Sequence, residues 1–271
     1  MSFKEILVCA DANKVAASSL DTACKLATKL DAHLVALHVL PLPVIPTDAF
    51  GGIPVEVIEW QQEYARKQSD AAKREVDLAA QRNGCPIEWR TVEGDIAETA
   101  LLHSRYADLV VLGQTGAEVS TGLAESILMG SGRPVLMVPH DGKVRSVGER
   151  VLIAWNRSRE ATRAVHDALP LLTGAKKVTV MEVDPSRGRD RHFPGADIVR
   201  HLTRHGVNAE ASATTADGIG VANAILSRAA DLDIDCLVMG GYGHSRLGEL
   251  VFGGVTRTIM DSMTIPTLMS H

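Results

Sequence analysis

The chain has 271 residues, of which 45% are hydrophobic and 23% charged, a balance typical of folded globular proteins and not of disordered ones. A formal net charge of −5 argues against a binder of duplex nucleic acid, which would carry a basic face. The sequence has no apolar run of the roughly 18 residues that a membrane span requires, no secretory signal at its start and no CxxC pair among its four cysteines. We therefore expect a cytoplasmic protein without a membrane segment.

Predicted strands and helices alternate along the chain, in the same order in both halves. In the first half we predict strands at residues 6–11, 34–39, 107–113 and 134–138, helices at 18–30 and 55–82, and a Pro- and Gly-rich loop at 42–54. In the second half we predict strands at residues 151–156, 178–183, 234–240 and 266–269, and helices at 158–172 and 255–263. The shared order indicates an internal duplication.

The two copies differ in the lengths of their loops. Matching residues are 145, 127 and 132 positions apart for the pairs Asp11–Asn156, Gly113–Gly240 and Pro134–Pro266. The first half therefore has 18 more residues than the second before its glycine loop and 5 fewer after it. We assign much of the extra length to the loop at residues 42–54.

Both halves are predicted to be α/β domains. Their strand segments are continuously apolar, which is typical of parallel strands covered by helices on both faces. A polar stretch with two glycines, residues 140–148, separates the copies and gives predicted domains at 1–142 and 148–271. Duplication favours a pseudo-twofold pairing of the halves, and the alternative is two tethered domains with little mutual contact.

The most informative segment runs from Gly240 to Thr256, between the end of a predicted strand and the start of a predicted helix. Glycines allow the backbone to approach an anion closely, and the first N–H groups of a helix attract negative charge. The N–H groups of Gly253, Gly254 and Val255 and the hydroxyl of Thr256 would supply such donors. Two further side chains in the loop could act as charge partners, namely those of His244 and Arg246.

Other nucleotide motifs fit this segment less well. The GxxxxGK(S/T) pattern of P-loop proteins is absent, and Arg246 stands where a GxGxxG motif would have its third glycine. The loop also follows the fourth strand of its half, whereas dinucleotide-binding loops follow the first. A simpler alternative remains open, in which the glycines only form a tight turn that packs strand against helix.

The spacing Gly240-x2-Gly243-x9-Gly253 resembles the ATP-binding signature of universal stress proteins, G-x2-G-x9-G-(S/T). The resemblance covers nearly the whole chain twice, as in tandem-type members, and includes the segment 94–98. It implies that each half is a five-stranded parallel sheet of order 3-2-1-4-5 with helices on both faces. It further implies that the halves pair as a pseudo-dimer and that ligand binds where the first and fourth strands part.

The resemblance also implies roles for individual residues around ATP or AMP, with or without Mg²⁺. Base and ribose would lie beside Ala154, Trp155 and Asn156, and the adenine edge would meet the backbone of Val183. Ribose and phosphates would be surrounded by Gly240, Gly243, Gly253, Gly254, Val255 and Thr256, with His244 nearby. Two residues depart from the family pattern: Gly254 replaces its Ser or Thr, and Asn156 replaces an Asp that the first half retains as Asp11.

The first half carries a shorter version of the glycine motif. Gly113-Gln114-Thr115-Gly116 begins it, but only five residues separate Gly116 from Gly122, which aligns with Gly254. We predict that this half is degenerate and mainly structural. Asp11 would then be a helix cap or a relic of a former site.

No catalytic or metal site is predicted. His201 and His205 lie four residues apart on a predicted helix, but the sequence offers no third ligand beside them, so an exposed pair is the preferred interpretation. Ser126 and Ser131 lack the GxSxG context of a hydrolase nucleophile, and no pair of acids stands at strand ends as an acid–base couple.

Three hypotheses for the function follow. The first is a nucleotide-binding protein with a stress-response or regulatory role that is not a dedicated enzyme. The second is a structural or interaction protein of the same fold that binds no nucleotide, and the third is a slow ATPase or phosphotransferase. The expected partner is an adenine nucleotide, with no nucleic acid and no membrane, and a homodimer of two chains is left open beside the pairing within the chain.

Overall fold

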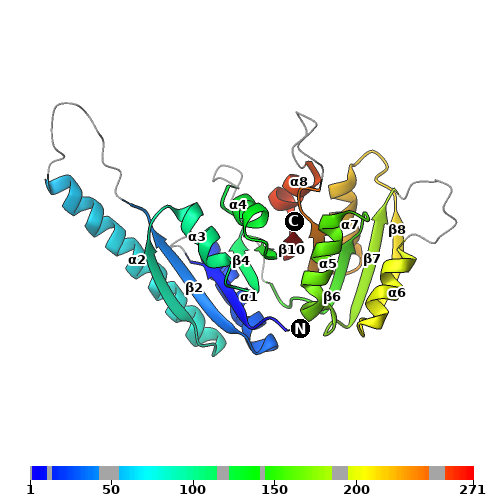
Figure 1. The fold of residues 1–271 in the computed structure, drawn as a ribbon, viewed down its shortest axis with the longest axis horizontal. Helices are drawn as coiled ribbons and strands as arrows, with labels where there is room; N and C mark the ends of the chain where they lie inside the picture. Colours follow the sequence, from blue (N-terminus) through cyan, green and yellow to red (C-terminus); the bar gives the residue numbers. More distant parts are fainter. Residues whose placement is uncertain are drawn as a thin grey trace.

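The computed structural model of the chain describes residues 2–10, 14–42, 55–114, 122–140, 144–184, 195–243 and 254–271. Within these ranges no helix is both long enough and apolar enough to cross a bilayer. Figure 1 shows two halves of similar construction, which splay apart on either side of a central pair of strands.

Strands and helices alternate as the sequence predicts. The first half contains β1 (Glu5–Cys9), α1 (Lys14–Leu30), β2 (His33–Leu40), α2 (Val55–Asn83), β3 (Glu88–Glu93), α3 (Ile96–Ser104), β4 (Leu109–Gly113), α4 (Gly122–Gly130) and β5 (Val135–Val138). The second half contains β6 (Arg150–Ala154), α5 (Arg159–Leu172), β7 (Lys177–Val183), α6 (Ala196–Arg204), β8 (Ala209–Thr214), α7 (Val221–Asp231), β9 (Cys236–Gly240), α8 (Gly254–Ser262) and β10 (Thr267–Ser270).

The described strands form a single ten-stranded sheet of order β3-β2-β1-β4-β5-β10-β9-β6-β7-β8. Each half is a parallel sheet of order 3-2-1-4-5 within this array, which confirms the predicted fold class. The sequence did not predict that the two five-stranded sheets would be continuous. They join through the antiparallel pair of β5 and β10.

The register of that joining pair is symmetric. Leu136 of β5 faces Leu268 of β10, and these two residues occupy matching positions after Pro134 and Pro266. A pseudo-twofold axis therefore passes between the two leucines, as in an isologous dimer interface. The predicted pairing of the halves takes this form.

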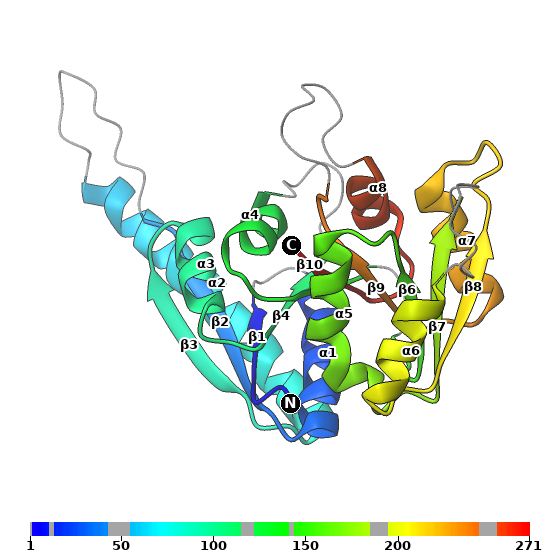
Figure 2. The same cartoon turned by 45° about the vertical axis from the view of Figure 1, so that its right-hand side comes forward.

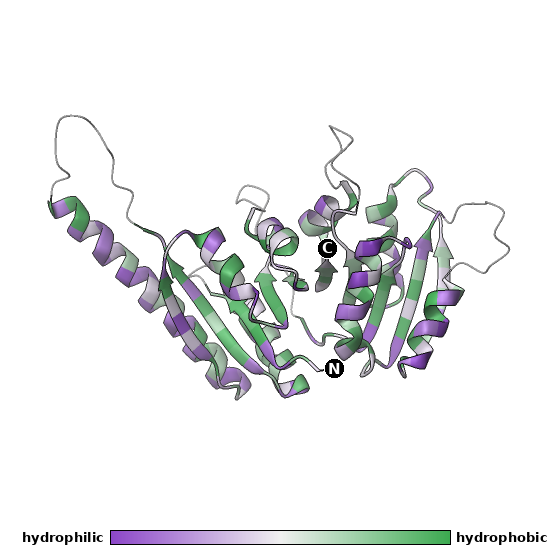
Figure 3. Cartoon of the chain, in the orientation of Figure 1, coloured by the Kyte–Doolittle hydropathy of each residue, from purple (hydrophilic) through white to green (hydrophobic). Residues whose placement is uncertain are grey.

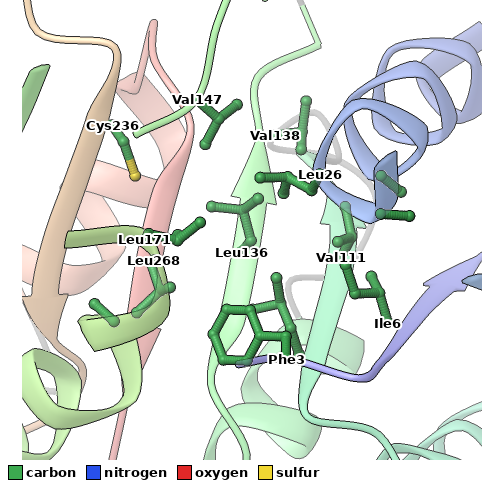
Figure 4. Packing of buried hydrophobic residues seen from close by; sticks show 14 of the residues in the cluster. Phe3, Ile6, Leu26, Val111, Leu136, Val138, Val147, Leu171, Cys236 and Leu268 are labelled. Atoms are coloured by element: carbon green, nitrogen blue, oxygen red, sulfur yellow. The ribbon is translucent and has the colours of Figure 1, made fainter. Parts of the chain in front are cut away.

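Two layers of helices cover the sheet, because alternate side chains of each buried strand point to opposite faces. Helices α1, α2, α5 and α6 pack on one face, and α3, α4, α7 and α8 pack on the other. Figure 4 shows how the first core runs without interruption across the joining strands, from Phe3 and Val111 through Leu136 and Leu268 to Leu171. The apolar strands between the helices are evident in the hydropathy colouring of Figure 3.

The described end of the segment between the halves, residues 144–148, packs against both of them. The carboxylate of Asp235 accepts hydrogen bonds from the backbone N–H groups of Gly148, Glu149 and Arg150, at 3.0–3.1 Å. The ammonium group of Lys29 in α1 donates to the carbonyl oxygen of Val147 at 3.0 Å. These contacts and the shared sheet exclude the alternative of two domains with little mutual contact.

Candidate functional site

The candidate site lies at the edge of the sheet where β6 and β9 end. The two strands are parallel neighbours, and their last paired residues are Ala154 and Met239. Helix α5 follows β6 on one face of the sheet, whereas α8 follows β9 on the opposite face. A parallel sheet opens at such a switch of faces, so Trp155 and Gly240 leave it side by side. This is the edge at which the sequence predicted a ligand.

The glycine at position 240 is required by close packing. A Cβ atom there would lie 2.6 Å from the backbone nitrogen of Ala161 and 2.8 Å from Cβ of Glu160, in the first turn of α5. Such distances are well inside van der Waals contact, so no other residue fits without moving the helix. For Gly240, therefore, the simpler alternative of strand–helix packing applies, whether or not a ligand is also bound there.

The two ends of the glycine segment are tied together. The backbone N–H of Tyr242, which has a positive φ of 54°, donates to the hydroxyl oxygen of Thr256 at 3.1 Å. Thr256 belongs to the first turn of α8 and is only 4% exposed. This bond holds the start of α8 against the end of β9. Figure 2 shows the two elements next to each other. The hydroxyl group of Thr256 thus stabilises the segment itself.

The start of α8 is open on the side of the described residues. Apart from its own helix and chain neighbours, a Cβ atom on Gly254, the first residue of the helix, would meet no atom of the described residues within 4 Å. The next residue, Val255, is 37% exposed. Because the first N–H groups of a helix have no partner within the helix and carry partial positive charge, this end can accept an anion.

The backbone of Val183 faces the same edge from the neighbouring strand. The N–H of Trp155 donates to the carbonyl oxygen of Met181 at 2.9 Å, and Ala154 opposite Met181 is the last paired residue of β6. Backbone groups alternate in direction along a strand, so those of Val183 point toward the space beyond the end of β6. They are positioned to bind a planar ligand edge at the place that the sequence predicted.

Asn156 lies at the surface and helps to start α5. Its side-chain oxygen accepts a hydrogen bond from the N–H of Ser158 at 3.1 Å. The hydroxyl oxygen of Ser158 accepts in turn from the N–H of Ala161 at 3.1 Å, which caps the helix. Ala154 and Trp155 are half-buried beside it. The predicted ribose-binding residue is therefore held by the cap of α5.

Three charged residues at this edge were missed by the sequence analysis. The buried carboxylate of Glu160 has one oxygen 3.0 Å from the position of a Cβ on Gly243. The guanidinium group of Arg157 lies 3.4 Å from the carboxylate of Glu182, which also accepts from the N–H of Gly195 at 2.7 Å. Glu182 could have been noticed, because it is an acidic residue in an otherwise apolar strand.

Three predicted residues, His244, Arg246 and Gly253, lie outside the described residues. The structure brings the other predicted positions to one edge: Ala154, Trp155, Asn156, Val183, Gly240, Gly243, Gly254, Val255 and Thr256. This edge offers backbone donors at a helix start, a strand backbone and charges of both signs. It is suited to a ligand that has a planar polar part and an anionic part.

The matching edge of the first half is occupied by contacts to the second half. Gln114, which follows β4, is buried and donates to the carbonyl oxygens of Met260 and Asp261 at the end of α8. Its side-chain oxygen lies 3.2 Å from both the backbone nitrogen and the ring nitrogen Nδ1 of His140. Asp11 and the shortened loop at residues 115–121 lie outside the described residues.

A histidine cluster on α5 and α6 also differs from the sequence-based expectation. The rings of His201 and His205 are joined by that of His166, with centroid separations of 4.7, 5.2 and 6.3 Å. The sequence analysis missed His166 because it lies on another helix. Within the described ranges no set of three or more His, Cys, Asp or Glu side chains is arranged to hold a metal ion.

Comparisons with known proteins agree with this architecture. The family model described as "Universal stress protein family" matches twice, at residues 2–139 and 148–271. Among proteins with curated descriptions, no sequence matches the chain.

Two solved structures resemble the whole chain in fold. A universal stress protein from Archaeoglobus fulgidus is 18% identical, with 98% of this chain and 95% of that one covered and a TM-score of 0.73. A functionally unknown protein from Pseudomonas aeruginosa is 15% identical, with 99% and 92% covered and a TM-score of 0.59. Because both halves match the family model and account for most of the sequence, the chain belongs to the universal stress protein family, with two of its domains in tandem.

Proposed function

We propose that the protein binds an adenine nucleotide, ATP or AMP, at the edge formed by β6, β7, β9 and α8, and that this binding serves a stress-response or regulatory role. The observation that carries the proposal is the bond between Tyr242 and Thr256, which joins the two ends of the glycine segment at 3.1 Å. That bond puts the glycine turn after β9 next to the open first turn of α8. Phosphate groups bind to such helix starts through backbone N–H groups.

The neighbouring groups support the same ligand class. The backbone of Val183, beyond the last pair of β6, suits the polar edge of a purine, and Asn156 at the surface suits a ribose hydroxyl. Arg157 is paired with Glu182, and the buried carboxylate of Glu160 is paired with Arg159 at 3.3 Å. Because Arg159 is largely exposed, it offsets the charge of Glu160 only in part, and this carboxylate repels phosphate unless a further cation lies between them. We therefore expect Mg²⁺ to strengthen the binding of ATP more than that of AMP.

The decisive variant is Gly254→Asp. The new Cβ meets no neighbouring atom of the described residues within 4 Å, and an acidic residue in the first turn of a helix is stabilising, so the fold is expected to persist. The new carboxylate would occupy the place proposed for phosphate, and binding should fall at least tenfold. Isothermal titration with ATP and with AMP, each with and without Mg²⁺, measures this.

Two matched controls complete the experiment. Gly254→Ala should retain binding, and Gly122→Asp, which makes the same change at the first residue of α4, should leave it unaltered. Absence of binding by the wild-type protein at millimolar nucleotide would refute the proposal and leave the structural role. Phosphate release from ATP above the level of Gly254→Asp would add a slow hydrolytic activity.

A further inference from the structure

Helix α2 extends beyond the sheet that it covers. Its buried residues are Ala72, Val76 and Ala79, all in its second half, whereas its first half projects past the ends of β2 and β3 (Figure 1). The stretch from Val55 to Ala71 is about 25 Å long at 1.5 Å per residue. None of these residues is buried by the described part of the chain, and a helix of this length with so little tertiary packing is marginally stable in water, so a partner along it would stabilise it.

An apolar stripe follows one side of the projecting part. Trp60 is 65% exposed and Tyr64 is 54% exposed, and their rings stack with centroids 5.6 Å apart. Val57 lies one turn before them on the same side and is 40% exposed. The spacing of three and four residues continues through Lys67 and Ala71, as in the contact seam of paired helices. Exposed aromatic residues at such spacing mark a contact surface.

The charges of α2 indicate which partner fits. Residues 55–65 contain three glutamates and no basic residue, a net charge of −3. Residues 66–74 contain four basic residues and one aspartate, a net charge of +3. An antiparallel copy of the same helix would bring each acidic segment against a basic one, whereas a parallel copy would bring like charges together.

We propose that two copies of the chain associate through an antiparallel pair of α2 helices, with the stripe of Val57, Trp60 and Tyr64 in the contact and the twofold axis at Tyr64, so that residues 57–63 of one copy face residues 65–71 of the other. The contact would be isologous, so both chains present the same surface and the assembly closes as a dimer. Each aromatic side chain can bury about 150–250 Å², which leaves the total below that of a standard interface. The dimer is therefore weak and concentration-dependent.

The first test is sedimentation equilibrium of the full chain over a range of concentrations. The weight-average mass of the wild type should rise toward twice that of the monomer, and the double variant Trp60→Ala, Tyr64→Ala should raise the dissociation constant at least tenfold. Tyr106→Ala removes a 72% exposed aromatic residue in the turn just after α3 and is the matched control, expected to dimerise like the wild type. The proposal is overturned if the wild type stays monomeric at every concentration tested. The stripe would then be a contact surface for a different protein.

Charge reversal tests the orientation. Replacing Glu56, Glu59 and Glu63 by Lys should weaken an antiparallel dimer at least tenfold, because basic segments would then face each other. A parallel pair would be little changed, since acid against acid becomes base against base. Reversing residues 66, 67, 73 and 74 in the same chain should restore association. Circular dichroism verifies that helicity is kept, and an unchanged dimer in the first variant contradicts the antiparallel arrangement.

Discussion

The ends of β4 and β9 are equivalent positions in the two halves, yet their first side chains do different things. After β4, the buried amide of Gln114 crosses to the carbonyl oxygens of Met260 and Asp261 in the other half. After β9, the phenol of Tyr242 crosses to Glu125 of α4 at 2.7 Å, while its backbone N–H binds the start of α8. Both edges hold the halves together, and the second additionally supports an open helix start.

This difference shows how one fold can use equivalent edges differently in two copies, one for assembly alone and one for assembly together with the ligand binding that we propose. The first edge uses its side-chain bonds for the contact between halves, in keeping with the proposal that this half is mainly structural. The second edge uses a side chain for that contact and keeps its backbone for the glycine segment. Both burial and the bond to Glu125 raise the pKa of Tyr242, so the phenol stays protonated and continues to donate.

The largest effect should come from Gly240→Leu, which tests whether this glycine is fixed by packing. The new Cβ would lie 2.6 Å from the backbone nitrogen of Ala161, and neither the strand nor the helix can easily retreat. We expect a loss of about 3 kcal/mol in the free energy of unfolding, measured by urea denaturation. Gly254→Ala, where the added methyl meets no neighbouring atom of the described residues within 4 Å, should change it by less than about 0.5 kcal/mol. Equal effects of the two changes would contradict the distinction between packing and open positions.

A smaller difference in the free energy of unfolding should separate variants of the two contacts between the halves. Gln114→Ala leaves the carbonyl oxygen of Met260 without its partner in a buried place and that of Asp261 in a partly buried one, and should cost about 2–3 kcal/mol. Tyr242→Phe removes one hydrogen bond between half-buried groups and should cost about 1 kcal/mol. Urea denaturation of both variants and of the double variant measures this. If Tyr242→Phe costs as much as Gln114→Ala, the second edge depends on its side chain as strongly as the first.

The smallest effect concerns pH and the histidine cluster of the second half. Burial lowers the pKa of His201 below its usual 6.5, and the charges of His205 and His166 from α6 and α5, with that of Arg204, lower it further. The unfolded chain therefore binds a proton at His201 more readily than the folded chain does. The contribution of uncharged His201 to the free energy of unfolding is present above about pH 6.5 and is lost as the pH falls below that value. His201→Gln should show a shallower decline of the free energy of unfolding between about pH 7 and pH 5. Parallel curves would show that the cluster does not contribute.

Much of the fold was predictable, because it depends on patterns that are local in the sequence. The apolar run of β6 and the glycine after β9 indicate buried parallel strands and a turn without any knowledge of their neighbours. The joining of β5 to β10 was not predictable in this form, since Leu136 and Leu268 read like any other buried strand residues. Edge pairing leaves no separate mark on an apolar strand.

The candidate site was predictable in part for the same reason. Gly240, Gly254 and Val183 were found from spacing and from the resemblance. Glu160 and Arg157 were missed, because their relevance depends on how the first turn of α5 meets the glycine segment. Contacts of this kind involve residues distant in the sequence, and they become evident only in three dimensions.

The antiparallel pair of β5 and β10 has a consequence for how the protein responds to dilution. A pairing between separate chains weakens as they are diluted, but here both partners belong to one polypeptide, so each meets the other at a fixed effective concentration. Symmetry is also no longer enforced. In a homodimer each substitution appears in both subunits, but within one chain the two sides of the axis can differ, and Val135 is matched by Thr267. Covalent linkage has thus let one copy change while the other retains its loop.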